Sequence, residues 1–313
     1  MNKSTKIWLN YITGGAISVL LLWAIYKQVL KQVKDLSTDM WQHTGPVGYL
    51  VACIILMFAN ALLESYKWHS LLSRAEQVSF STAFSSWLAG VAFSIITPNR
   101  IGEYPGRILY LGGSNTFRYI NVSVYGITSQ LAGIYFWGFV GLIYYNIAFP
   151  DTMADAALGV CVLINIFISV VYWRFDSWVP AMTQNKWLRR FAVYGRLMGR
   201  VSAAEKLKVL TISLLRVMVF TAQYLFLLRW MNVDVPLLQG FCLAALFFWV
   251  MAVIPSLALT ELGIRGAVSL YIFAHFSSNT IGILAATTGL WLLNLVIPSV
   301  AGSVLITKMK WLK

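Results

Sequence analysis

Two pairs of glutamate and arginine stand out in this chain because each of them interrupts a long apolar stretch. Glu103 and Arg107 lie in "ITPNRIGEYPGR", and Glu261 and Arg265 lie in "VIPSLALTELGIR"; the glutamate precedes the arginine by four residues in both. On a helix this spacing places both side chains on one face, in the favourable order. Arginine binds phosphate well, through paired hydrogen bonds. The two pairs therefore predict an anion-binding site inside apolar surroundings.

Helix-breaking prolines accompany both pairs. Pro98 precedes the first pair and Pro255 precedes the second, and a proline ends a helix because it lacks a backbone donor. Pro105 follows Glu103 closely, in the first turn of a new helix, where proline is tolerated. We expect the second new helix to begin near Thr260. Each new helix would then aim its N-terminus, which favours anions, into the protein interior.

Other charged residues leave more than one interpretation open. Arg100, beside the first break, is either a ligand contact or a snorkelling anchor. Arg216 has the same two interpretations. We expect Glu64 to be interfacial and His275 to be a hydrogen-bonded core residue. Ionisable residues inside a membrane suggest function, but the Glu–Arg pairs could also be structural. The predicted binding residues are Arg100, Glu103, Arg107, Arg216, Glu261 and Arg265.

The composition indicates the elements that position these residues. Of the 313 residues, 11% are charged and 59% are hydrophobic, and apolar runs of about 20 residues recur. Six runs predict full transmembrane helices, at 8–26, 47–66, 120–145, 156–173, 209–228 and 281–306. Two interrupted regions, 80–118 and 236–278, predict broken or re-entrant helical hairpins. We therefore expect one all-α membrane domain over residues 1–313, with an uncleaved first helix.

The basic residues predict the orientation of the helices. The loop 174–208 holds eight Lys and Arg, which indicates the cytoplasm. Both termini and the loop 67–76 are then cytoplasmic, and residues 8–145 and 156–306 form an inverted repeat with one hairpin each. The location expected is a bacterial inner membrane. The segment 27–46 is external although it carries three lysines, and we interpret it as an amphipathic interfacial segment.

Several classes of site are not expected. The three cysteines lie apart in apolar runs, the six aspartates are unclustered, and the three histidines share no metal-ligand spacing. No nucleotide-binding motif occurs, so we expect no cofactor and no metal. The isoelectric point near 9.7 is explained by cytoplasmic loops that face anionic lipids, rather than by nucleic acid. The partners expected are lipids with anionic or phosphate-bearing headgroups; homo-oligomers and envelope-biosynthesis proteins remain open.

Four stretches resemble the lysylphosphatidylglycerol synthase transmembrane-region family of flippase-like proteins, over about residues 10–306. They are "ESYKWHSLL", "VSFSTAFSSWLAGVAFSIITPNRIGEYPGR", "LTISLLRVMVFTAQYLFLLRWMNVDV" and "VIPSLALTELGIRGAV". Two departures stand out: Ser129-Gln130 replaces a Glu-Arg pair common in the family, and "SLALT" replaces a glycine-rich run. Well-known relatives add a soluble aminoacyl-transferase domain, whose activity we do not expect in a chain ending at Lys313.

Three classes of function are compatible with these features. The resemblance and the arginines favour a transporter that moves an anionic lipid, or a lipid-linked sugar or phosphate, between leaflets. The energy would come from an ion gradient or a lipid gradient. A membrane-embedded prenyl or phosphoryl transferase would need clustered carboxylates for its metal, which the sequence lacks. A non-transporting accessory subunit of an envelope assembly is the other alternative.

Overall fold

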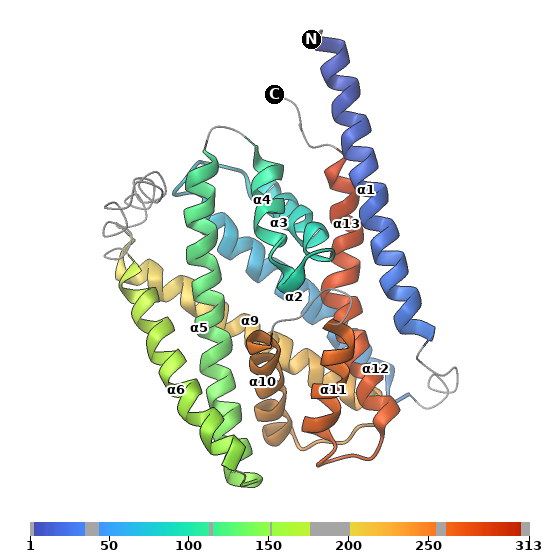
Figure 1. Ribbon diagram of the computed structural model, residues 1–313, viewed down its shortest axis with the longest axis vertical. Coiled ribbons are helices and arrows are strands. Elements are labelled where there is room, and N and C mark those ends of the chain that lie inside the picture. Colours follow the sequence, from blue (N-terminus) through green and yellow to red (C-terminus); the bar gives the residue numbers. More distant parts are fainter. Residues whose placement is uncertain are drawn as a thin grey trace.

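A computed structural model describes residues 3–34, 44–112, 115–150, 152–175, 201–254 and 261–307 of the chain. These residues form helices and no strands, which confirms the all-α class (Figure 1). The helices are α1 Lys3–Lys34, α2 Val47–Leu72, α3 Phe80–Ser94, α4 Glu103–Leu111, α5 Thr116–Ala148, α6 Thr152–Trp173, α9 Ala203–Trp230, α10 Leu237–Val253, α11 Glu261–Phe273, α12 Thr280–Trp291 and α13 Ile297–Ile306.

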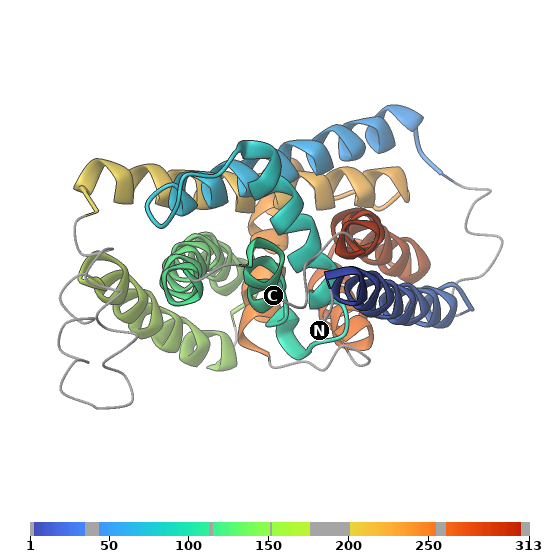
Figure 2. The ribbon, with the colours of Figure 1, turned by 90° about the horizontal axis from the view of Figure 1, so that it is seen from above.

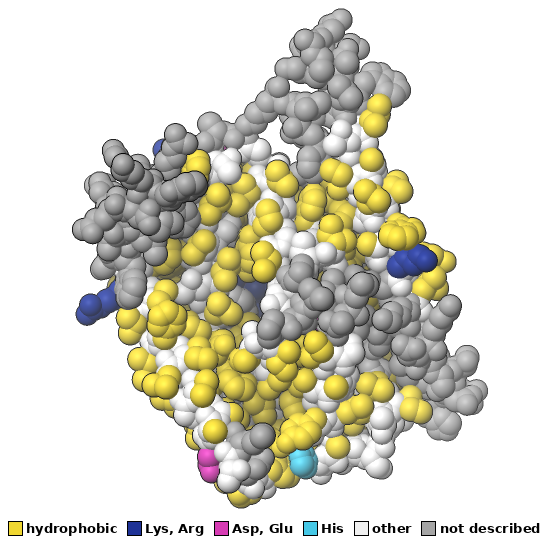
Figure 3. All heavy atoms as spheres, viewed as in Figure 1, with side chains coloured by type: hydrophobic (Ala, Val, Ile, Leu, Met, Phe, Trp, Pro, Cys, Tyr) yellow, Lys and Arg dark blue, Asp and Glu magenta, His cyan; other side chains and the backbone are white. Residues whose placement is uncertain are grey.

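Five helical segments of the described chain are long and apolar enough to cross a membrane: Val47–Leu72, Thr116–Ala148, Ala154–Trp173, Ala203–Trp230 and Thr280–Ile306. Five of the six predicted spans fall within them. The remaining predicted span, 8–26, lies in α1, whose described apolar part, Ile12–Lys27, is shorter than a full span. The described surface in Figure 3 is mostly hydrophobic, as a face in contact with lipid must be. The protein is therefore an integral membrane protein.

Helices α3 and α4 form a hairpin that returns to the end of the bundle where it starts. Asn115, which follows the hairpin, donates a hydrogen bond of 2.9 Å to Glu76, which precedes it. The two helices pack closely where Gly90 faces Gly106: a Cβ atom on Gly106 would lie only 2.9 Å from the Cα atom of Gly90, so the contact depends on the missing side chain. Ser79 caps the first helix by accepting from the backbone N–H of Thr82 at 3.2 Å.

Helices α10 and α11 form the second interrupted pair, at the opposite end of the bundle (Figure 1). Asn279 follows this pair and donates a hydrogen bond of 2.9 Å to the carbonyl of Met231, which precedes it. Helix α10 packs tightly on α5, because Gly138 faces Trp249 and Gly141 faces the carbonyl of Cys242. The two pairs therefore extend into the bundle from opposite ends.

Long helices surround the two pairs. Helices α2 and α9 lie side by side along one flank, and α1 lies beside α13 (Figure 2). Ser18 of α1 donates a hydrogen bond of 2.7 Å to the carbonyl of Ser303 in α13. Gly302 of α13 faces the carbonyl of Leu88, so α13 also packs closely on α3.

Two predicted loops are shorter than the sequence indicated. Helix α1 continues to Lys34, so the first part of the segment 27–46 is helical, and residues 35–43 lie outside the described residues. Helix α2 continues to Leu72, which places Lys67 in a helix and leaves it 2% exposed rather than in a cytoplasmic loop. The assignment of Lys67 to a loop was wrong because hydropathy falls at a charged residue even where neighbouring helices bury that residue. Most of the basic loop, 176–200, is outside the described residues.

Candidate functional site

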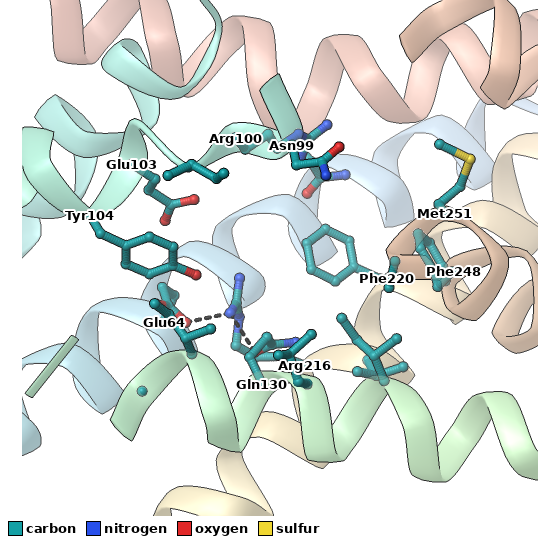
Figure 4. Close-up of a pocket in the computed structure, with 18 of the residues that line it drawn as sticks. Glu64, Asn99, Arg100, Glu103, Tyr104, Gln130, Arg216, Phe220, Phe248 and Met251 are labelled. Carbon is teal, nitrogen blue, oxygen red and sulfur yellow. Dashed lines mark hydrogen bonds and ion pairs between the residues drawn. The ribbon is translucent and has the colours of Figure 1, made fainter. Parts of the chain in front are cut away.

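A cavity of about 560 Å³ lies where the two hairpins approach each other inside the bundle. Residues from α2, α4, α5, α9, α10, α11 and α12, from the turn that follows α12, and from the tip of the first hairpin line it (Figure 4). Its size is typical of a small-molecule site. All six predicted binding residues are among its lining residues: Arg100, Glu103, Arg107, Arg216, Glu261 and Arg265.

Glu64 is the centre of a buried charge cluster on one side of this cavity. Its side chain accepts a hydrogen bond of 2.7 Å from Arg107 and lies 2.9 Å from the amine of Lys67. It also forms an ion pair with Arg216. Glu64 is 4% exposed, so the expectation that it is interfacial was wrong. A carboxylate has enough acceptor positions for three cations, and three cations offset the cost of burying it.

Arg107 joins the first hairpin to this cluster. Besides Glu64, it binds Glu103, so the predicted pairing across one helical turn of α4 is confirmed. The guanidinium also lies 5.2 Å from the ring centre of Trp68 and 5.8 Å from that of Tyr104. These contacts fix the side chain, because cation–π attraction adds to the two ion pairs. Arg107 is 3% exposed.

Arg216 of α9 points into the bundle instead of snorkelling to the membrane surface. It donates to Asn60 at 3.0 Å and to Gln130 at 2.8 Å, in addition to its ion pair with Glu64. Gln130 also accepts from Lys67 at 3.1 Å, and Figure 4 shows it beside Arg216. The amide of Gln130 thus occupies the place where the family often carries a charged pair.

A second charge cluster joins the tips of the two hairpins. Within α11, Arg265 donates a hydrogen bond of 2.9 Å from Nε to Glu261, and its Nη2 atom lies 2.7 Å from the same carboxylate oxygen, which confirms the second predicted pair. Arg100, at the tip of the first hairpin, lies 3.2 Å from the same carboxylate. Arg100 and its neighbour Asn99 have φ angles of 57° and 47°, in the left-handed region that is uncommon for residues other than glycine. Arg100 therefore contacts the second hairpin.

The predicted helix breaks agree with the structure where it describes them. Helix α3 ends at Ser94, and Pro98 begins a 3₁₀ turn, Pro98–Arg100, before α4 starts at Glu103. Pro105 lies in the first turn of α4, as expected. Pro255 and Thr260 lie outside the described residues. Helix α10 ends at Val253, and the described part of α11 begins at Glu261.

Sequence reasoning missed several polar residues of the cavity besides Glu64, among them Lys67, Gln130 and Asn294. Lys67 was assigned to a loop, and Gln130 was noted only as a departure from the family. Asn294 was not noticed: it lies in a π-helical turn, Leu292–Val296, and donates to Gln223 at 2.7 Å. Such turns often occur at functional sites. The available signal was the charged segment "ESYKWH", which carries part of the family resemblance.

The other side of the cavity is apolar. Phe220, Phe248 and Met251 lie together there (Figure 4), and the ring centre of Phe220 lies 5.6 Å from the guanidinium of Arg216, where the apolar side meets the charged side. Leu131 and Ile134 of α5 also belong to this side. Each of the five is partly exposed rather than fully buried. The cavity is therefore amphipathic, with charge at one side and hydrocarbon at the other.

Two further predictions concern groups away from this cavity. His275 does not line it: the residue is exposed and stacks on Phe149, with ring centres 4.2 Å apart, so the expectation of a core residue was wrong. Within the described residues, no three His, Cys, Asp or Glu side chains are grouped so that they could hold a metal ion. Cys53, Cys161 and Cys242 are buried free thiols.

Comparison with known proteins identifies the family to which the chain belongs. No curated protein matches the chain. Residues 11–302 match the family described as the lysylphosphatidylglycerol synthase TM region. That match includes both hairpins and every residue named above as lining the cavity. The chain belongs to the lysylphosphatidylglycerol synthase TM-region family.

Proposed function

We propose that this protein moves an anionic lipid, or a lipid-linked sugar or phosphate, between the two leaflets of a bacterial inner membrane. The observation that carries the proposal is the amphipathic cavity between two hairpins that extend from opposite ends of the bundle. A headgroup would bind at its charged side, while the hydrocarbon chains would leave along Phe220, Phe248 and Met251.

The charge of the cavity supports an anionic headgroup. Five cationic side chains and three carboxylates of the described residues line it: Lys67, Arg100, Arg107, Arg216 and Arg265 against Glu64, Glu103 and Glu261. Unpaired positive charge is costly inside a membrane protein, and an anion would offset it. Alternating access of such a site is how many transporters built from inverted repeats work.

The proposal includes the finer topology. The two halves, residues 8–145 and 156–306, would be inverted repeats with three full spans and one hairpin each, and both termini would lie in the cytoplasm. The protein would bind the lipid and move it between leaflets, and the lipid would not be changed covalently. In the proposed mechanism, the cavity between the hairpin tips would open alternately toward one leaflet and then toward the other.

Leaflet exchange in liposomes tests the proposal. Purified protein should accelerate the exchange of a fluorescent anionic lipid, measured by quenching the outer leaflet, and the recovered lipid should have unchanged mass. Arg216→Gln should reduce the rate at least about tenfold, because it removes a hydrogen-bonded cation from the cavity.

Arg229→Gln is the matched control, because Arg229 lies on the same helix but binds the carbonyl of Val235, at 2.9 Å, away from the cavity. Its rate should match that of the wild type. If the wild-type protein exchanges no lipid faster than empty liposomes, the transport proposal fails and an accessory role becomes the better account.

A further inference from the structure

The charged side chains of the cavity divide into two clusters with the same imbalance. The α2 cluster contains Lys67, Arg107 and Arg216 against Glu64 and Glu103, and its ion pairs are continuous. The hairpin-tip cluster contains Arg100 and Arg265 against Glu261. Each cluster has one more cation than carboxylate. Two separate excess charges, rather than one, therefore line the same cavity.

Each cluster also holds an unused hydrogen-bond donor. The Nε atom of Arg107 in the α2 cluster and that of Arg100 in the hairpin-tip cluster are buried and have no partner among the described residues. The hydroxyl of Ser123, which also lines the cavity, is likewise buried without a partner there. Buried polar groups almost always have partners in folded proteins. The unused donors indicate that a ligand with several acceptor oxygens completes the site.

This inference rests on the proposed function and narrows its cargo. We infer that the headgroup carries two negative charges, as a terminal phosphate or a diphosphate, rather than the single charge of a phosphodiester. A dianion would neutralise both clusters at once, whereas a monoanion would leave one of them with an unpaired cation. A terminal phosphate also presents three free oxygens, which match the multiple donors of the arginines.

The geometry of the tip supports a headgroup that contacts both clusters. Arg100 belongs to the first hairpin but pairs with Glu261 of the second, so the hairpin-tip cluster exists only where the two hairpins meet. Arg107, which pairs with Glu64 in the α2 cluster, lies in α4 and so belongs to the same hairpin as Arg100. A phosphate group bound between Arg100 and Arg107 would thus be held by residues seven positions apart in one hairpin.

Binding of chain-matched lipids tests the inference independently of transport. We would measure the affinity of the purified protein, at pH 7.5 and fixed salt, for dihexanoyl phosphatidic acid, phosphatidylglycerol and phosphatidylcholine. These probes share their acyl chains and carry about two, one and no net charges, because a phosphomonoester has a second pKa near ~6. Phosphatidic acid should bind at least about tenfold more tightly than phosphatidylglycerol. Equal affinity for these two lipids overturns the inference.

Charge-removing variants should change this preference in a defined way. Arg100→Gln and Arg216→Gln each remove the excess charge of one cluster, so the preference for phosphatidic acid should fall to less than about threefold. Arg229→Gln, outside the cavity, should keep the wild-type preference. If both cavity variants keep it as well, the preference comes from elsewhere and the inference fails.

A comparison of pyrophosphate with a lipid diphosphate tests whether the bound phosphate belongs to a lipid or to a soluble compound. Pyrophosphate should bind more weakly than farnesyl diphosphate, which has the same diphosphate group on an apolar chain. If the two bind equally well, the double-charge inference stands but the cargo is a soluble phosphate compound, and the lipid-transport proposal fails. If both lipids and phosphates bind but no lipid exchange occurs, only the transport proposal fails.

Discussion

Replacing Glu64 by glutamine should destabilise the protein more than any other single carboxylate-to-amide change in its described part. Glu64 is 4% exposed and forms ion pairs with Lys67, Arg107 and Arg216. Removing one partner of a buried ion pair typically costs ~3–5 kcal/mol, because the charge left behind is uncompensated. For a chain of this length, 1 kcal/mol corresponds to roughly 2 °C, so we expect Tm to fall by roughly 6–10 °C.

The buried thiols provide the assay. Cys53, Cys161 and Cys242 are buried, so a thiol-reactive dye will report unfolding of the purified protein as the temperature rises. Asp234→Asn is the matched control, because Asp234 is 92% exposed in its side chain and lies 4.0 Å from Arg229. It should change Tm by less than roughly 1 °C.

A double variant tests whether the loss comes from uncompensated charge. Adding Arg216→Gln to Glu64→Gln removes one of the cations that Glu64 neutralises, so part of the lost Tm should return. If Glu64→Gln alone melts within about 1 °C of the wild type, the carboxylate does not hold the cluster together. The reasoning about buried charge at this site would then be refuted.

Three more predictions follow from the hairpins. Cysteines introduced at Glu76 and Asn115 should be labelled from the same side of the membrane, because the native side chains are in contact; opposite labelling would refute a returning first hairpin. Arg265→Lys should slow lipid exchange at least about tenfold although it keeps the charge, because a lysine amine cannot reproduce both contacts of the guanidinium with Glu261, the hydrogen bond from Nε and the ion pair through Nη2. Hydrogen bonds from Tyr119 and Asn115 lower the pKa of Glu76, so its carboxylate stabilises the fold above its ordinary pKa, near ~4.3. The Tm difference between wild type and Glu76→Gln should therefore be present at pH 7 and disappear as the pH falls through that lowered pKa; a constant difference would contradict this assignment.

The sequence predicted most of the hairpin chemistry because that chemistry is local. Glutamate and arginine four residues apart must share a helical face, so the pairs Glu103–Arg107 and Glu261–Arg265 follow from spacing alone. The prolines likewise act on their own helices, and Pro105 lies in the first turn of α4 as expected.

The sequence could not reveal the centre of the site because Glu64 acts through tertiary contacts. Its partner Arg216 is distant in the chain, and both looked like charges near a membrane surface. Lys67 was assigned to a loop for the same reason, although α5 and α9 supply its hydrogen-bond partners Gln130 and Ser213. A hydropathy plot falls at every charged residue. Only the packing of the helices shows that residues of neighbouring helices offset the energetic cost of burying that charge.

At the tip of the first hairpin, the backbone conformation of Arg100 would suit glycine better, so the side chain explains why arginine occupies this position. Left-handed φ angles at Asn99 and Arg100 cost of order 1–3 kcal/mol each, and glycine would adopt them without that cost. The turn is held by a hydrogen bond of 2.8 Å from the backbone of Gly102 to the hydroxyl of Thr97, and by the ion pair with Glu261. A glycine at position 100 would relax the backbone but remove the cation that joins the two hairpins. Local rules are usually broken in this way at functional or strained sites, and here the strained backbone carries the guanidinium that pairs with Glu261 where the two hairpins meet.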